Sequence, residues 1–319
     1  MAVVPAIDLV LRTTTGLRLI DAWSGQPVTD GLRCALRRVR DGREIARAAV
    51  SAGGVHHWPG LRWPWNADDL AGRAAAGDPS PPAPPQALAE IVVEDPLGRF
   101  LPLRLDWPLP PDAPGGALAS LVLPSAPGRV APPGSAGITG LLLLDPPPGS
   151  PAGTEPPPAA FARVLAADGQ GRNTEGMTDA AGRLALHLPF PRPERKPQSS
   201  PPASPPELAP PPGAPVTLRV FHDPAVVAEA VARASLVAAA NAARRRAGGS
   251  ATDAASGAAS AFTVIPHAAR WRAQPEVRAL ARIATADALG PLRLEAGRLA
   301  VPVTEGLPPH RPELRLAPL

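Results

Sequence analysis

Short segments in which apolar and polar residues alternate recur along this chain, and turn residues separate them. Over 32–39 one face is apolar and arginines lie between its residues, which predicts a strand with the arginines facing solvent. The Asp-Gly pair at 41–42 predicts a hairpin with a return strand over 44–50. A second hairpin is expected over 89–105. Short strands at this spacing favour a β-sandwich over an alternating α/β fold.

The second half of the chain repeats this pattern. The apolar run Ile138–Leu144 is typical of a central strand. Near the C-terminus, the turn Glu295-Ala-Gly297 predicts a closing hairpin of 292–294 with 299–303. The remaining strands of this half are expected at 118–123, 161–166, 176–178, 183–188 and 216–221.

Two helices are expected in this half. Asp223-Pro224 opens an alanine-rich segment that reaches Arg246, with Asp as the N-cap and Pro at the first helical position. Three arginines, Arg244 to Arg246, stand in its last turn, where they suit the negative end of the helix dipole. The spacing of apolar residues predicts a second, shorter helix over 274–287.

These elements predict a mainly β protein of two sandwich domains. The first domain spans 1–107 and includes a flexible proline-rich loop at 66–87, and 108–117 is a linker. The second spans 118–308, with a proline-rich loop at 189–215 and a helical insertion at 223–288. A tail over 309–319, which we expect to be frayed, completes the chain. The length of 319 residues agrees with two domains.

The composition adds little about the partner. The 47 prolines and 29 glycines cluster in the expected loops, and 45% hydrophobic residues are enough for packed cores. Arginine almost completely replaces lysine, which a GC-rich genome explains. The net charge is only +4, and the one dense cluster of basic residues is Arg244, Arg245 and Arg246. These three arginines are a candidate partner site, but so small a cluster argues against nucleic acid as the partner.

Three tryptophans within eight residues form the other candidate binding site. Trp58, Trp63 and Trp65 would make either an exposed platform for a sugar ring or a protein partner, or a plug for the open end of the first sandwich. Both alternatives stay open at this point.

No residue pattern predicts a catalytic, cofactor-binding or metal site. His56 and His57 are adjacent, so on a strand they point to opposite faces and cannot easily share one metal ion. Asp179 fits a turn in which its side chain caps the backbone and Gly182 takes a positive φ. Cys34 alternates with leucines and is expected to be a buried, inert thiol.

The chain is expected to be cytoplasmic and not to span a membrane. Asp8 interrupts the first apolar run, so the pattern of a secretory signal is missing. The longest apolar stretch, 225–243, carries Glu229 and Arg233 and is dominated by alanine, which falls short of a membrane span.

Two segments resemble the transthyretin-like, or carboxypeptidase regulatory-like, sandwich, a fold of the immunoglobulin-like kind. One is the run Gly16-Leu-Arg-Leu-Ile-Asp-Ala-Trp-Ser-Gly-Gln-Pro-Val28, and the other is Thr178-Asp-Ala-Ala-Gly-Arg-Leu-Ala-Leu186. In the first copy Ser51-Ala-Gly-Gly54 stands where the Thr-Asp-x-x-Gly element would be. The transthyretin-like hydrolases of purine breakdown share this fold, but their histidine placements and Tyr-Arg-Gly-Ser tail are absent.

A looser similarity is to sandwich proteins encoded with phage-tail-like contractile injection machines. The residues that carry it are Phe100-Leu-Pro-Leu-Arg-Leu105, 123–134, Gly182–Pro191, Ala273-Gln-Pro275 and 289–294. This resemblance implies a structural or adaptor protein of a baseplate or tail, located in the cytoplasm or within an assembled particle. Its partners would be other protein subunits.

Two alternatives remain. The chain would be a carbohydrate- or surface-binding module if Trp58, Trp63 and Trp65 form an exposed platform. It would be a hydrolase, for example a metal-dependent one, if the fold assembles a site that the sequence does not show.

Overall fold

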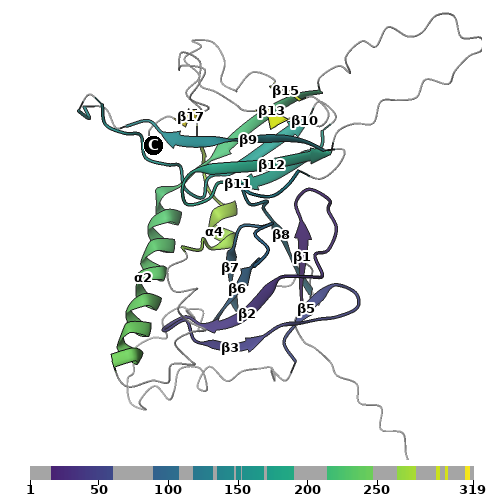
Figure 1. Cartoon of the computed structure of the whole chain (residues 1–319), viewed down its shortest axis with the longest axis vertical. Helices are drawn as coiled ribbons and strands as arrows, with labels where there is room; N and C mark the ends of the chain where they lie inside the picture. The colour runs from purple at the N-terminus through teal and green to yellow at the C-terminus, as the bar shows by residue number, and fades with distance from the viewer. Residues whose placement is uncertain are drawn as a thin grey trace, which may run out of the picture.

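The computed structural model of the chain is mainly β (Figure 1). It describes residues 16–59, 89–107, 118–131, 135–146, 149–151, 153–168, 171–189, 214–246, 264–277, 292–294, 299–300 and 313–316. Within these ranges it has several small sheets and two helices, one of them long.

Two sheets from the first part of the chain share one core. Sheet I has the strand order β4-β5-β1-β8, and sheet II has the order β3-β2-β6-β7. Leucines of β1 and β8 in sheet I meet Leu36, Ile91 and Leu103 of sheet II in this core, and we call the two sheets the first sandwich. The strands are β1 (Gly16–Asp21), β2 (Arg33–Arg38), β3 (Glu44–Arg47), β4 (Ala49–Val50), β5 (Val55–His57), β6 (Ala89–Glu94), β7 (Leu103–Trp107) and β8 (Leu118–Leu123).

Two further sheets form the second sandwich. Sheet III has the order β12-β9-β16, with β17 also on β9, and sheet IV has the order β11-β10-β13-β14, with β15 also on β13. Their shared core includes Ile138 and Leu186 of sheet III and Leu218 and Val220 of sheet IV. The strands are β9 (Ser135–Leu144), β10 (Arg163–Asp168), β11 (Asn173–Met177), β12 (Arg183–Pro189), β13 (Ala214–Phe221), β14 (Glu276–Val277), β15 (Leu292–Leu294), β16 (Leu299–Ala300) and β17 (Glu313–Leu316).

Apart from β4 and β15, the two sandwiches have the same strand order and strand directions. In sheet I, β1 has an antiparallel neighbour, β5, and a parallel one, β8. In sheet III, β9 likewise has an antiparallel neighbour, β12, and parallel neighbours, β16 and β17. Sheets II and IV are each antiparallel throughout their four-strand path. The repeat expected from the sequence is therefore present as a repeat of topology.

Two equivalent turns show this repeat at the level of single hydrogen bonds. In the first sandwich the Ser51 side chain accepts from the Val55 amide at 3.2 Å, and Gly54 has a φ of 74°. In the second, the Asp179 side chain accepts from the Arg183 amide at 2.9 Å, and Gly182 has a φ of 77°. Serine thus replaces aspartate as the capping residue, because either side chain can accept the same bond.

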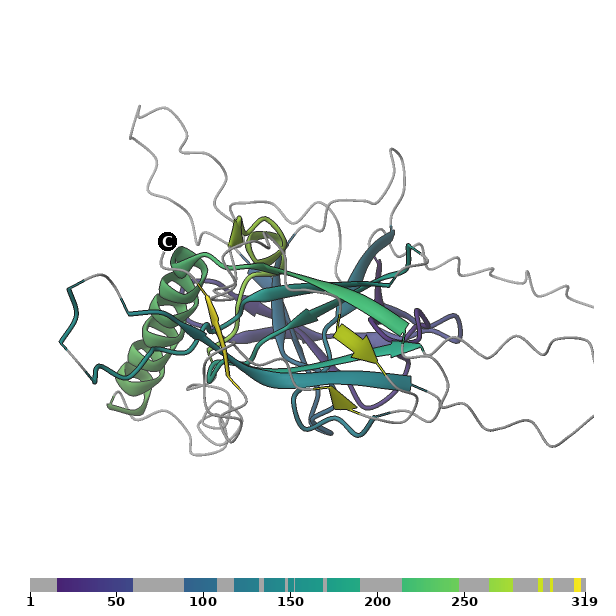
Figure 2. The same ribbon diagram turned by 90° about the horizontal axis from the view of Figure 1, so that it is seen from above.

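The sandwiches differ in how the last two strands of the four-strand sheet are joined. In sheet II a short connection that begins with the turn at 95–98 joins β6 to β7, as expected. In sheet IV the equivalent strands β13 and β14 are separated by residues 222–275, which contain α2 (Pro224–Arg246) and α4 (Ala268–Arg272). Figure 1 and Figure 2 show α2 at one side of the molecule, alongside the first sandwich.

The start of α2 confirms the predicted cap. The Asp223 side chain accepts a hydrogen bond from the Ala225 amide at 2.8 Å, and Pro224 is the first helical residue. This bond satisfies one of the amides that a helix N-terminus leaves without a backbone partner.

Four expectations about strand and helix placement are wrong. Residues 276–277, expected in a helix, form β14, and 278–287 lie outside the described residues. The expected hairpin near the C-terminus is not one, since β15 pairs with β13 whereas β16 pairs with β9. β8, expected in the second sandwich, pairs with β1 of the first. The tail expected to be frayed contains β17, whose Leu316 is fully buried.

The hairpin of β2 also differs from the expectation. Arg37 does not face open solvent, because its side chain is largely buried and pairs with Glu94 at 2.9 Å. The return strand expected over 44–50 is divided between two sheets, since β3 pairs with β2 whereas β4 pairs with β5. The predicted loop at 66–87, the linker at 108–117 and most of the loop at 189–215 lie outside the described residues.

Candidate functional site

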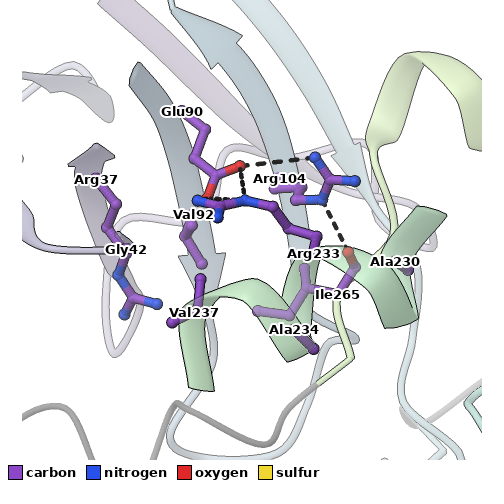
Figure 3. Close-up of a pocket in the computed structure, with 10 residues that line it drawn as sticks. All are labelled: Arg37, Gly42, Glu90, Val92, Arg104, Ala230, Arg233, Ala234, Val237 and Ile265. Atoms are coloured by element: carbon purple, nitrogen blue, oxygen red, sulfur yellow. Dashed lines mark hydrogen bonds and ion pairs between the residues drawn. The ribbon is translucent and has the colours of Figure 1, made fainter. Parts of the chain in front are cut away.

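Helix α2 lies over the outer face of sheet II, the face turned away from the core of the first sandwich. Alternation along β6 places Ile91 and Val93 in the core and Glu90 and Val92 on the outer face. Figure 3 shows Glu90 on this face, with side chains of α2 beside it. The helix therefore covers a face that carries a buried charge.

Glu90 is the centre of this contact. Arg233 of α2 donates from its Nε to both carboxylate oxygens of Glu90, at 3.1 and 3.2 Å, and its Nη2 forms an ion pair with the same group. The Nη1 of Arg104, on β7, lies 3.6 Å from the carboxylate. Two guanidinium groups, one from the sheet and one from the helix, thus share one buried carboxylate.

Arg104 extends the network to the segment before α4. Its Nε donates to the Ile265 carbonyl at 3.0 Å, and its backbone amide donates to the Pro266 carbonyl at 3.2 Å. Its Nη2 also pairs with Glu229 of α2. Both helices of the insertion are therefore tied to β7.

The cavity beside Glu90 is small. Its volume is about 40 Å³, and its lining includes Glu90, Arg104, Arg233 and Val237 (Figure 3). A space of this size holds a few waters at most, whereas small-molecule pockets are about ten times larger. We therefore interpret the network as a contact between elements of the chain and not as a ligand pocket.

Apolar side chains also join the first sandwich to the second sandwich and to α4. Phe161 and Met177 of the second sandwich, with Trp271 of α4, belong to the same buried cluster as the core of the first sandwich. Gln274 donates to the Phe161 carbonyl at 3.0 Å and so holds this residue, whose φ is 56°. The two sandwiches and the insertion are thus packed as one body.

The polarity of α2 is unusual for a surface helix. Its charged residues Glu229 and Arg233 point toward the first sandwich, beside the buried Ala230. Its outer face carries Val231 and Leu236, which are 46% and 47% exposed. A surface helix usually places its apolar stripe inward and its charges outward. In α2 the apolar residues Val226 and Ala230 are buried on the inward side, but the charges in the middle of the helix face inward beside them.

The predicted arginine cluster lies at the end of this helix. Arg244 donates to the Asp41 carbonyl at 2.7 Å, which links α2 to the hairpin between β2 and β3. Arg246 donates to the Ala242 carbonyl at 3.4 Å, and the side chain of Arg245 lies outside the description. A role of these arginines in binding a partner stays a prediction.

Of the three tryptophans predicted as a binding site, only Trp58 lies among the described residues. Trp58 is buried and packs edge-on against Trp107, with ring centroids 5.2 Å apart. Its ring therefore fills the core of the first sandwich and is not part of an exposed platform. Trp63 and Trp65 lie outside the described residues, so their predicted binding role stays a prediction.

By length and composition, Pro224–Arg244 does reach the range of a membrane span, with a mean hydropathy of 1.4. The sequence-based expectation that it falls short is therefore corrected. The inward ion pairs of Glu229 and Arg233 hold the helix against the first sandwich. Insertion of this helix into a membrane would require these ion pairs to break.

Other residues singled out from the sequence serve the fold. Asp179 caps its turn as expected, accepting from the amides of Ala181 and Arg183. Cys34 is buried, as expected, and burial raises the pKa of its thiol. His56 is buried whereas His57 is partly exposed, as their opposite directions on β5 require.

Burial of histidines within the described residues is a feature that sequence reasoning does not reveal, and it matters at His56, His187 and His222. Burial lowers the pKa of His56, His187 and His222 below the ordinary value of 6.5. Arg129 lowers the pKa of His187 further, whereas Asp21 opposes this. Each histidine is therefore held in a place that favours its neutral form.

No protein-family model, no curated protein and no solved structure matches this chain.

Removing the Glu90 charge should destabilise the protein strongly. In the variant Glu90→Gln, Arg233 and Arg104 lose their shared carboxylate, and breaking a buried ion pair typically costs about 3–5 kcal/mol. Chemical denaturation would measure the free energy of unfolding. The matched control is Glu276→Gln, which removes an exposed pair with Arg219 and should change little. Equal effects of the two substitutions would contradict the central place of Glu90.

The buried histidines should make the protein sensitive to mild acid. Their folded-state pKa values lie below the unfolded value, so below about pH 6.5 the unfolded chain binds more protons and stability falls. We expect the free energy of unfolding to be highest above this pH and to decrease by about pH 5.5. The variant His187→Gln should reduce this slope. A free energy of unfolding that stays constant or rises as the pH falls would contradict the expectation.

Proposed function

We propose that the chain is a non-enzymatic structural or adaptor protein of a larger assembly. The observation that carries this proposal is the unusual polarity of α2, which directs its central charges toward the first sandwich and turns Val231 and Leu236 outward. Exposed apolar side chains on a helix are a common element of protein–protein contact surfaces.

The packing of the two sandwiches supports this role. The ionic network around Glu90 and the shared apolar cluster at Phe161 and Trp271 hold both sandwiches and α2 as one body. A rigid body presents its contact face in a fixed direction, which lowers the entropy cost of assembly.

The more specific form of the proposal is a baseplate or tail-associated component of a phage-tail-like contractile injection machine. Its support is the sequence resemblance carried by Phe100–Leu105, Gly182–Pro191 and the further segments given above. The carbohydrate-binding alternative loses one of its three tryptophans, since Trp58 is buried.

Purification from the native host tests this proposal. The tagged protein should bring sheath, tube or baseplate proteins with it, identified by mass spectrometry. The variant Leu236→Glu should lose them, because a charge is placed on the exposed apolar face of α2. The control Val130→Glu changes a residue that is 86% exposed and remote from α2 in sequence, and it should retain them. Recovery of the folded protein without such partners would contradict the proposal.

A further inference from the structure

The outer face of α2 is uncharged over most of its length. Exposed positions recur along the helix every three or four residues, which keeps them on one face. Alanine fills most of these positions, and Leu236 is the largest uncharged side chain among them. The positions that follow this spacing, which we call the outer stripe, are Ala225, Ala228, Ala232, Ser235, Leu236, Ala239, Ala243 and Arg246, and Val231 lies beside them.

The outer stripe is arranged symmetrically about the point between Ser235 and Leu236. Ala232 and Ala239 lie equally far from this point, and so do Ala228 and Ala243. If two copies of α2 pack antiparallel about a two-fold axis at this point, each position of the outer stripe faces another. Such a self-complementary patch is what a two-fold contact between identical chains requires.

The charges at the helix ends favour the antiparallel arrangement. Asp223 caps the N-terminus, whereas Arg246 of the outer stripe stands at the C-terminus. Antiparallel packing brings the aspartate of one copy toward Arg246 of the other. Parallel packing would instead bring Arg246 of both copies together. The two helix dipoles are also oriented favourably in the antiparallel pair.

The small side chains allow two helices to approach closely, so the contact suits a helix as its partner. Leu236 of each copy would lie at the centre, and the helix of 23 residues is about 34 Å long. We propose that a second copy of this chain docks antiparallel on the outer stripe of α2. This inference rests on the proposed function, since it names a partner for the assembly surface.

Cysteine crosslinking of the purified full chain tests it. Cys34 is buried, so an introduced cysteine is the reactive one among the described residues. Antiparallel packing places position 232 of one copy beside 239 of the other. Two copies of position 232 would then lie about 10 Å apart along the helix, beyond the reach of a disulfide.

A mixture of the variants Ala232→Cys and Ala239→Cys, one of them carrying a size tag, should form the mixed disulfide dimer under mild oxidation. Each variant alone should form less. Adding Leu236→Glu to both should abolish the mixed dimer, and circular dichroism checks that these variants fold. Val130→Cys, at an exposed position outside α2, gives the background of random collisions.

No mixed dimer above the Val130→Cys background would overturn the inference, and so would efficient crosslinking of Ala232→Cys to itself, which indicates parallel packing. These outcomes are independent of the pull-down from the host. A crosslinked dimer that recovers no host proteins would support this inference and contradict the proposed function. Recovery of host proteins without a crosslinked dimer would support the proposed function and overturn this inference.

Discussion

The buried carboxylate of Glu90 constrains the position of α2. A carboxylate on the covered face of a sheet is costly unless cations pair with it, and Arg104 and Arg233 provide that pairing. Arg233 can reach Glu90 only if the helix turns its charged side toward the first sandwich. The uncharged side of α2 is then necessarily the outer one, and the candidate contact surface follows from this single ionic contact.

Local features of the fold could be predicted from the sequence. The turns at Asp41-Gly42, Asp95–Gly98 and Asp179–Gly182 are recognisable because their hydrogen bonds lie within a few residues. The cap of α2 at Asp223 is equally local. Features that depend on distant pairing could not be predicted. The parallel pairing of β8 with β1 and of β17 with β9 leaves no signature in either strand alone.

The same distinction applies to the candidate site. The arginines at 244–246 are adjacent in the sequence, but Glu90, Arg104 and Arg233 are far apart and only the fold brings them together. A signal is nevertheless present, because Glu90 interrupts the apolar residues of 89–93 and Glu229 lies one helical turn before Arg233. The burial of Trp58 is one of two alternatives in the sequence, since three tryptophans beside two prolines fit both a buried plug and an exposed platform.

Hydrogen–deuterium exchange along α2 tests the central claim most directly. If the ion pairs of Glu229 and Arg233 hold the helix on sheet II, the amides of α2 should exchange slowly, close to the rate of those in β6, to which it is packed. Fast exchange throughout α2, with β6 still protected, would show that the helix is not held there and would contradict the account.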